Sequence, residues 1–240
     1  MKLSVVIPSY NESRNFNRGC LEQVRDYLKT NHLNWEVIIV DDGSTDGSDK
    51  KIKIFAGKNN WYFIENPHQG KAASVMTGVL AATNPYILFT DFDQATPLSE
   101  VEKLLPFLSK GYQIVVGSRE IKGARRQQEP FYRHIMGKVF NFVVQLVAVK
   151  GIHDTQCGFK IFSTHVAREL FQALKVYRPK PEKYAFTGAF DVELLYLAGK
   201  SGIKIAEVPI VWTHAATTRV SPFRDSIRMF WHVLKIRLYD

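Results

Sequence analysis

The sequence lacks the features of membrane-spanning and disulfide-stapled proteins. It has only two cysteines in 240 residues, Cys20 and Cys157, and their spacing fits neither a disulfide framework nor a set of metal ligands. The longest apolar stretch, residues 139–149, is interrupted by polar side chains and is shorter than the roughly 20 residues that span a bilayer. Residues 1–8 lack the pattern of a signal peptide. We therefore expect a protein of a reducing, cytoplasmic compartment that meets a membrane only at its surface.

Internal repeats, low-complexity tracts and recognisable linkers are also lacking, which favours a single domain over residues 1–240. Apolar residues make up 45% of the chain and charged residues 23%, a balance that excludes intrinsic disorder and supports a buried core. Lys and Arg number 32 against 23 for Asp and Glu, so the net charge is +9. This excess favours anionic partners, which include phosphorylated substrates, nucleic acid and acidic membrane surfaces.

The first half of the chain alternates between strand and helix patterns. Short apolar, β-branched runs predict buried strands at residues 3–7, 36–40, 61–64, 86–90 and 113–116. Apolar residues at helical spacing predict helices over residues 16–27, with Ser13 as N-cap, and over residues 71–83 and 98–108. Alternating units of this length predict an α/β fold whose sheet is doubly wound, mostly parallel and flanked by helices.

The second half is less regular and ends in an amphipathic helix. Helices are predicted at about residues 131–149, 164–174 and 190–198, and a strand at residues 203–211. In residues 222–240, one helical face carries Phe223, Ile227, Phe230, Trp231, Leu234 and Leu238, and its flank carries Arg224, Arg228 and Lys235. Such a helix can lie in the headgroup layer of a membrane or pack on the core of its own domain, and the sequence supports both readings.

Polar clusters follow three of the predicted strands, at residues 9–12, 41–44 and 91–93. The carboxyl ends of parallel strands meet at one edge of a sheet, so these clusters should converge there. Asp91 and Asp93 would point to the same side, because side chains in an extended segment alternate. Paired carboxylates together with substrate phosphates are how Mg²⁺ is usually held. The alternative for any single cluster is that it caps a helix or shapes a turn.

Basic residues concentrate after this region. Arg119 follows a predicted strand and Arg133 opens a helix, and the planar guanidinium of each suits a phosphate. Arg125 and Arg126 are predicted in a loop, either facing solvent or joining the phosphate site. The polar run 154–160 forms either a simple turn or part of the site. Cys157 within it has no accompanying His and Asn, so we expect a buried, unreactive thiol.

Several of these segments resemble the family 2 glycosyltransferases of GT-A fold. The segments, in order, are VVIPSYNE (5–12), VDDGSTDGS (40–48), GKAA (70–73), Asp91-x-Asp93, residues 117–119, and DTQCGFK (154–160). Within the family, DTQCGFK followed by FDVELL (190–195) is most similar to polyprenyl-phosphate sugar transferases, the dolichyl-phosphate glucosyltransferases in particular. The resemblance covers almost the whole chain.

The resemblance implies a role for each matching residue. Donor-binding residues would be Pro8, Tyr10, Glu12, Asp41, Asp42, Lys71, Asp91 and Arg219. Asp91 and Asp93 would bind Mg²⁺ or Mn²⁺, and Gln94, which departs from the usual small residue, could join them. Arg119 and Arg133 would bind the acceptor phosphate. The catalytic residues would be Asp93 and Asp154, with Asp154 either a base or an orienting group. Residues 1–118 would form the nucleotide-sugar half, 119–221 the acceptor side and 222–240 the membrane-surface helix.

The implied activity is a metal-dependent, inverting transfer of a hexose, glucose from UDP-glucose, to a polyprenyl or dolichyl phosphate at the cytoplasmic face of a membrane. Mannose transfer from GDP-mannose is the nearest alternative. A nucleotidyltransferase that forms sugar nucleotides is disfavoured because no glycine-rich loop follows the first strand. A nucleic-acid-binding module is disfavoured because no known binding motif is present. A catalytically inactive relative, the lipid chain length and the oligomeric state stay open.

Overall fold

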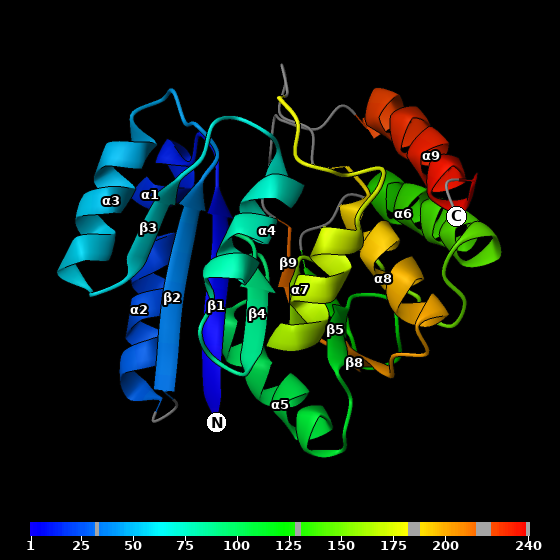
Figure 1. Ribbon diagram of the computed structural model, residues 1–240, viewed down its shortest axis with the longest axis horizontal. Coiled ribbons are helices and arrows are strands. Elements are labelled where there is room, and N and C mark those ends of the chain that lie inside the picture. Colours follow the sequence, from blue (N-terminus) through cyan, green and yellow to red (C-terminus); the bar gives the residue numbers. More distant parts are fainter. Residues whose placement is uncertain (32–33, 128–130, 182–187, 215–221, 239–240) are drawn as a thin grey trace.

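A central seven-stranded sheet organises the structure, a computed structural model that describes the chain except residues 32–33, 128–130, 182–187, 215–221 and 239–240 (Figure 1). The strand order is β3-β2-β1-β4-β7-β5-β8. The strands are β1 (Lys2–Ser9), β2 (Asn34–Asp41), β3 (Tyr62–Glu65), β4 (Tyr86–Thr90), β5 (Ile114–Ser118), β7 (Phe159–Ser163) and β8 (Ile205–Pro209). Only β7 runs antiparallel to its neighbours in this sheet. The prediction of a mostly parallel sheet is therefore confirmed.

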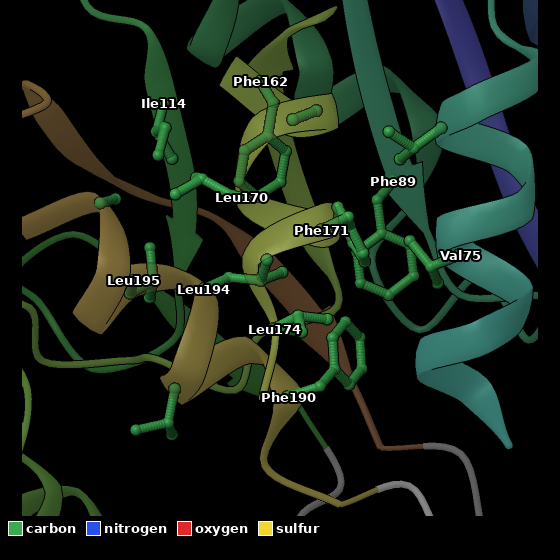
Figure 2. Close-up of a cluster of buried hydrophobic side chains, with 14 of the residues drawn as sticks. Val75, Phe89, Ile114, Phe162, Leu170, Phe171, Leu174, Phe190, Leu194 and Leu195 are labelled. Atoms are coloured by element: carbon green, nitrogen blue, oxygen red, sulfur yellow. The ribbon is translucent and has the colours of Figure 1, made fainter. Parts of the chain in front are cut away.

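Helices cover both faces of this sheet, which is why its central strands are apolar on both sides. Along β1, Val5 and Ile7 face one core and Val6 faces the other. The first core packs against α2 (Cys20–Thr30), α3 (Ser48–Lys58) and α5 (Val101–Ser109). The second packs against α4 (Lys71–Ala81), α6 (Phe131–Val147), α7 (Thr164–Ala173), α8 (Phe190–Lys200) and α9 (Pro222–Leu238). Figure 2 shows the second core, where Phe89, Phe171 and Phe190 lie close together.

The helix expected over residues 16–27 is divided in two. α1 (Ser13–Asn17) and α2 are separated at Gly19, whose φ of 76° lies in the left-handed region. Ser13 is the first residue of α1 and not its N-cap, because the hydroxyl and amide of Ser13 bond to Asp46 instead. The Ser13 prediction was wrong because the chain between β2 and α3 supplies a partner that the local pattern does not reveal.

Two strands replace the single strand predicted at residues 203–211. β8 joins the central sheet, whereas β9 (Val211–Thr213) pairs with β6 (Arg125–Gln127) in a separate two-stranded sheet. Arg125 and Arg126 therefore lie in a strand and not in a loop. A 3₁₀ turn, η1 (Leu98–Glu100), precedes α5, and the Glu100 carboxylate accepts a hydrogen bond from the Val211 amide. This bond holds the start of β9 against the turn that follows β4.

The terminal helix α9 is apolar on two sides. Val233 and Ile236 are buried in the second core, with Met229 packed beside them. Phe230 and Trp231, which belong to the predicted apolar face, are exposed. The side chains at the start of α9 lie outside the described part. The helix thus packs on the core and still presents apolar side chains to its surroundings. Within the described residues, no helix is long and apolar enough to cross a membrane.

Candidate active site

The predicted polar clusters lie at the carboxyl-end edge of the central sheet. Ser9, at the end of β1, is in register with Asp41, at the end of β2. Asp91 follows directly after β4, and Arg119 follows directly after β5. Since β7 runs in the opposite direction, the turn 154–158 that precedes it reaches the same edge, where Phe159 pairs with Thr90. Residues from five distant segments therefore share one edge, as expected for a ligand site in an α/β sheet.

Asp41 and Asp42 are buried and shape the loops around them. The Asp41 carboxylate accepts hydrogen bonds from the amide and hydroxyl of Ser44, at 2.8 and 2.6 Å. The Asp42 carboxylate accepts hydrogen bonds from the amides of Gln69 and Gly70, both at 2.9 Å. Asp42 thus ties the end of β2 to the first turn of α4. That turn carries Lys71, so Asp42 positions a second predicted site residue.

A stacked pair of rings lies beside this loop. The rings of Tyr10 and His68 stack with centroids 4.3 Å apart and an interplanar angle of 10°. Nδ1 of His68 lies 2.8 Å from the Asp42 carboxylate, and Nε2 is buried without a hydrogen-bond partner. His68 was not predicted, because nothing in the sequence separates it from the other six histidines. Nearby, Pro8 lies half-buried in β1 and Glu12 is buried, where its carboxylate accepts a hydrogen bond from Asn15.

Lys71 and Asp91 form a partly exposed ion pair. Nζ of Lys71 lies 2.6 Å from Oδ1 of Asp91, and their side chains are 22% and 37% exposed. Burial alone would lower the pKa of Lys71, but the negative charges of Asp91 and Asp191 outweigh it and the net shift is upward. Gly158 lies directly against Asp91, since a Cβ on that glycine would be 2.1 Å from Oδ2. Lys71 therefore keeps its positive charge, and the pair packs closely against the DTQCGFK segment.

Asp93 and Gln94 extend this centre. Burial and the neighbouring charge of Asp91 raise the pKa of Asp93 to about 6. Gln94 has a left-handed φ of 51°, and its Nε2 donates to the Asp91 carbonyl, which leaves Oε1 as the atom that can serve a ligand. Two repelling carboxylates and an amide oxygen fit Mg²⁺ or Mn²⁺ held jointly with substrate phosphates. Among the described residues, no cluster of three or more His, Cys, Asp or Glu forms a complete metal site by itself.

A second, buried ion pair lies near this centre. Nζ of Lys160 is 2.5 Å from Oδ1 of Asp191 and also donates to the Cys157 carbonyl. The pair joins the DTQCGFK segment to the FDVELL segment at the start of α8. Its role was missed because a lysine in an apolar strand is not recognisable from sequence as buried. The available signal was that Lys160 and Asp191 each lie in a motif that resembles the family.

Arg119 and Asp154 pair with each other. Nε and Nη2 of Arg119 lie 2.7 and 2.8 Å from the two oxygens of Asp154, and the Arg119 amide donates to Asp154 at 2.9 Å. The guanidinium also stacks on Trp212, 5.3 Å from the ring centre. Burial by itself raises the pKa of Asp154, but the charge and hydrogen bonds of Arg119 outweigh it and hold that pKa below its usual value. The Asp154 side chain is fully buried, and its ion-pair partner is Arg119.

Other residues support this second pair. The Glu207 carboxylate accepts hydrogen bonds from the backbone amides of His153 and Asp154, at 2.8 to 3.1 Å. Arg126 pairs with Glu120 and donates to the Arg119 carbonyl, so it supports the site and does not face solvent. Arg133 lies in α6, but its side chain is outside the described part of the structure, as is the whole of Arg219.

The two thiols do not take part in this chemistry. Cys157 and Cys20 are both buried. Burial raises the pKa of Cys157 to about 12 and that of Cys20 to about 11. A thiol with such a pKa is almost entirely protonated at neutral pH and is a poor nucleophile. The expectation of an inert Cys157 agrees with its surroundings.

Comparison with known proteins identifies the family. The sequence matches glycosyl transferase family 2 over residues 4–171. It is 35% identical over 250 residues to the dolichyl-phosphate beta-glucosyltransferase of Dictyostelium discoideum, an alignment that covers 98% of this chain and 73% of that protein. It is 34% identical over 262 residues to the Homo sapiens protein of the same name, covering 99% of this chain and 75% of the relative.

Solved structures agree on the fold. Glucosyl-3-phosphoglycerate synthase from Mycobacterium tuberculosis, in complex with UDP, superposes with a TM-score of 0.68 at 19% identity, over 98% of this chain and 79% of that one. A mannosyltransferase from Pyrobaculum calidifontis, in complex with GDP-Man and Mn²⁺, gives a TM-score of 0.59 at 18% identity, over 98% and 69%. The chain therefore belongs to glycosyl transferase family 2 and is a glycosyltransferase of the GT-A fold.

Proposed function

We propose that this glycosyltransferase moves glucose from UDP-glucose to the phosphate of a dolichyl or other polyprenyl phosphate, with inversion, at the cytoplasmic face of a membrane. The observation that carries the proposal is the Lys71–Asp91–Asp93 centre at the sheet edge. It occurs in a chain that aligns along 98% of its length with a dolichyl-phosphate beta-glucosyltransferase. A centre of alternating charge suits a diphosphate bound with a cation.

Asp91, Asp93 and Gln94 would hold Mg²⁺ or Mn²⁺ in this reaction. A bound cation supplies electrostatic stabilisation of the negative charge that develops on the departing UDP. Lys71 contributes a second positive charge from the first turn of α4. Arg219 would add a third, as the family resemblance implies. Asp91 thus has two roles, as a metal ligand and as the partner that orients Lys71.

The nucleoside would lie at the other end of the same edge. The stacked Tyr10 and His68 rings form a flat surface against which a base can lie. Pro8, Glu12 and Asp41 complete this side as donor-binding residues. Asp42 acts on the donor through the loop that it holds.

The acceptor needs little help to attack. A phosphate monoester has a second pKa of about 6, so it is mostly dianionic at neutral pH and already nucleophilic. Arg119, together with Arg133, would bind that phosphate. Because Asp154 is buried against Arg119, we assign it to orienting the guanidinium and not to removing a proton. This chooses between the two roles that the sequence left open.

A transfer assay tests the proposal directly. The protein is incubated with dolichyl phosphate, Mn²⁺ and either radiolabelled UDP-glucose or GDP-mannose, and the lipid fraction is counted. We expect label in the lipid only from UDP-glucose, and none after chelation of the metal. Label from GDP-mannose alone would establish the mannosyltransferase alternative. Formation of a sugar nucleotide from UTP and a sugar phosphate would establish the nucleotidyltransferase.

Membrane contact is part of the proposal. Phe230 and Trp231 of α9 are exposed, as are Phe142 and Leu146 of α6, and the two helices pack against each other. Aromatic and aliphatic side chains of this kind enter the boundary between headgroups and acyl chains. A double variant, Phe230→Ser with Trp231→Ser, should lose flotation with vesicles while it keeps its fold. Unchanged flotation would remove the membrane role of this surface.

A further inference from the structure

A cavity of about 710 Å³ lies between the carboxyl ends of α6, α8 and α9. It is lined by Ile203 and Ile205 at the amino end of β8, and by Gly199 and Lys200 at the end of α8. The candidate active site lies at the opposite, carboxyl ends of the strands. Asp191 at the start of α8 belongs to that site, whereas the cavity is lined by α8 from Leu195 to Lys200, about 6 Å further along the helix at its nearest point. Figure 1 shows α6, α8 and α9 together at one end of the molecule.

The charge of this cavity is positive. Lys150, Lys200 and Arg237 line it, and no acidic residue is among the described residues that do so. Each cation lies at or just beyond the last turn of a helix, where the helix end carries about half a negative charge. Three full positive charges exceed three half charges, so the described lining carries a net positive charge. Arg237 is held in place by the Tyr196 hydroxyl, to which it donates at 2.9 Å.

The rim of the cavity is apolar. Leu146 both lines the cavity and is exposed on α6, and Leu238 follows Arg237 on α9 and is exposed as well. Phe142 lies one turn before Leu146, and Trp231 lies two turns before Leu238, so the apolar surface continues along both helices. A positive hollow at the end of an exposed apolar surface complements a ligand with an anionic head and hydrocarbon tails.

We propose that this cavity binds the phosphate headgroup of an anionic phospholipid at the membrane surface, separately from the polyprenyl phosphate acceptor. Lys150, Lys200 and Arg237 contact the phosphate, while Leu146, Leu238 and Trp231 contact the acyl chains. Basic residues near an anionic leaflet strengthen attachment, and a lipid held here would fix the orientation of α6 and α9 on the surface. The site goes beyond the transfer reaction, and its occupancy requires no sugar donor.

The chain contains a matched control for this site. α8 ends in Ala198-Gly199-Lys200 at the cavity, and α3 ends in the same tripeptide, Ala56-Gly57-Lys58, on the far side of the molecule (Figure 1). A Cβ built on either glycine meets no atom within 4 Å. Gly199→Gln therefore fills the cavity without a change of charge, and Gly57→Gln makes the same change elsewhere. Two double variants remove equal charge. Lys150→Gln with Lys200→Gln changes the cavity, and Lys51→Gln with Lys58→Gln changes α3 as the control.

Flotation with phosphatidylcholine vesicles, with and without phosphatidylglycerol, measures the effect. We expect the Lys150/Lys200 pair to lose about 30-fold in affinity for phosphatidylglycerol vesicles at low salt, and Gly199→Gln to lose affinity as well. The α3 variants should stay near wild type. Equal losses in the cavity and α3 variants would show diffuse charge attraction and overturn the proposal.

Soluble probes separate the source of the phosphate. Dihexanoyl phosphatidylglycerol and inorganic phosphate are titrated into the full chain by calorimetry. We expect the wild-type protein to bind the lipid and Gly199→Gln to lose this binding. Inorganic phosphate should not bind at the same concentration. Equal binding of inorganic phosphate, or no binding of either probe, would overturn the assignment to a phospholipid.

Discussion

Two ion pairs at the same sheet edge are built differently. Lys71 and Asp91 lie partly exposed, with Asp93 beside them at a raised pKa. Arg119 and Asp154 form a two-bond pair in which the carboxylate is fully buried. The first centre has excess negative charge and atoms facing outward. The second has its charges matched within the protein.

This difference assigns different tasks to the two centres. Carboxylates that repel each other gain from a cation, so the first centre is suited to a ligand that comes and goes. A buried pair that loses one member leaves an uncompensated charge, so the second centre is suited to hold a fixed geometry. We therefore propose that the same residue type, aspartate, serves binding at Asp93 and positioning at Asp154.

The largest expected effect is on catalysis at the first centre. Asp93→Asn should lower the rate of glucosyl transfer by about 10³-fold, because it removes a charge that holds the cation and the diphosphate. The partly exposed carboxylate contributes little to the fold, so thermal unfolding should change little. Steady-state kinetics and thermal melts on the same sample check this. A variant within tenfold of wild-type activity would contradict the role of Asp93.

The second centre should respond in the opposite way. Asp154→Asn leaves Arg119 without its buried counter-charge and should lower the free energy of unfolding by about 3 kcal/mol. Urea denaturation of this variant beside Asp91→Asn measures the contrast. If Asp91→Asn is the more destabilised of the two, the assignment of binding and structural roles is reversed.

A smaller effect is expected where the DTQCGFK segment meets the first centre. Gly158→Ala places a Cβ 2.1 Å from Asp91 Oδ2, so the carboxylate must turn away from Lys71. We expect about a tenfold loss of transfer activity, roughly 1.4 kcal/mol in the barrier. Gly57→Ala, where a Cβ meets nothing within 4 Å, is the control. Equal activity of both variants would show that Asp91 tolerates the displacement.

The smallest effect is on pH dependence. Asp93 has a raised pKa of about 6 in the folded protein, against 3.8 for an ordinary Asp, so the folded state binds more protons between these values. The metal-free protein should therefore gain stability from this group as the pH falls from 6 to 4. Affinity for Mn²⁺ should fall over the same range, because the proton competes with the metal. Asp93→Asn should remove the gain in stability between pH 6 and 4. If the variant still showed this gain, a group other than Asp93 would be titrating.

The placement of the proposed donor-binding residues at one sheet edge could largely be predicted from the sequence. The strands before Asp41 and Asp91 are short apolar runs with polar ends, and parallel pairing puts those ends at one edge. α3 was missed because lysines separate Ile52 from its neighbours and weaken the periodicity. β7 was missed because it begins inside a polar motif, at Phe159, and its burial depends on pairing with β4.

The contacts between distant segments could not be predicted. His68 depends on Asp42, which is 26 residues away, and Lys160 depends on Asp191, which is 31 residues away. Local pattern reports the element in which a residue lies, but not the partner that tertiary packing supplies. The pairing of Arg119 with Asp154 is of the same kind, and it is the observation on which the proposed orienting role of Asp154 rests.

Calorimetric titration of UDP-glucose, with and without Mn²⁺, into wild type, Asp93→Asn and Asp154→Asn tests the central claim most directly. The account predicts binding that needs Mn²⁺ in the wild type, is lost in Asp93→Asn and is retained in folded Asp154→Asn. Metal-independent binding in the wild type, or full binding in Asp93→Asn, would contradict it.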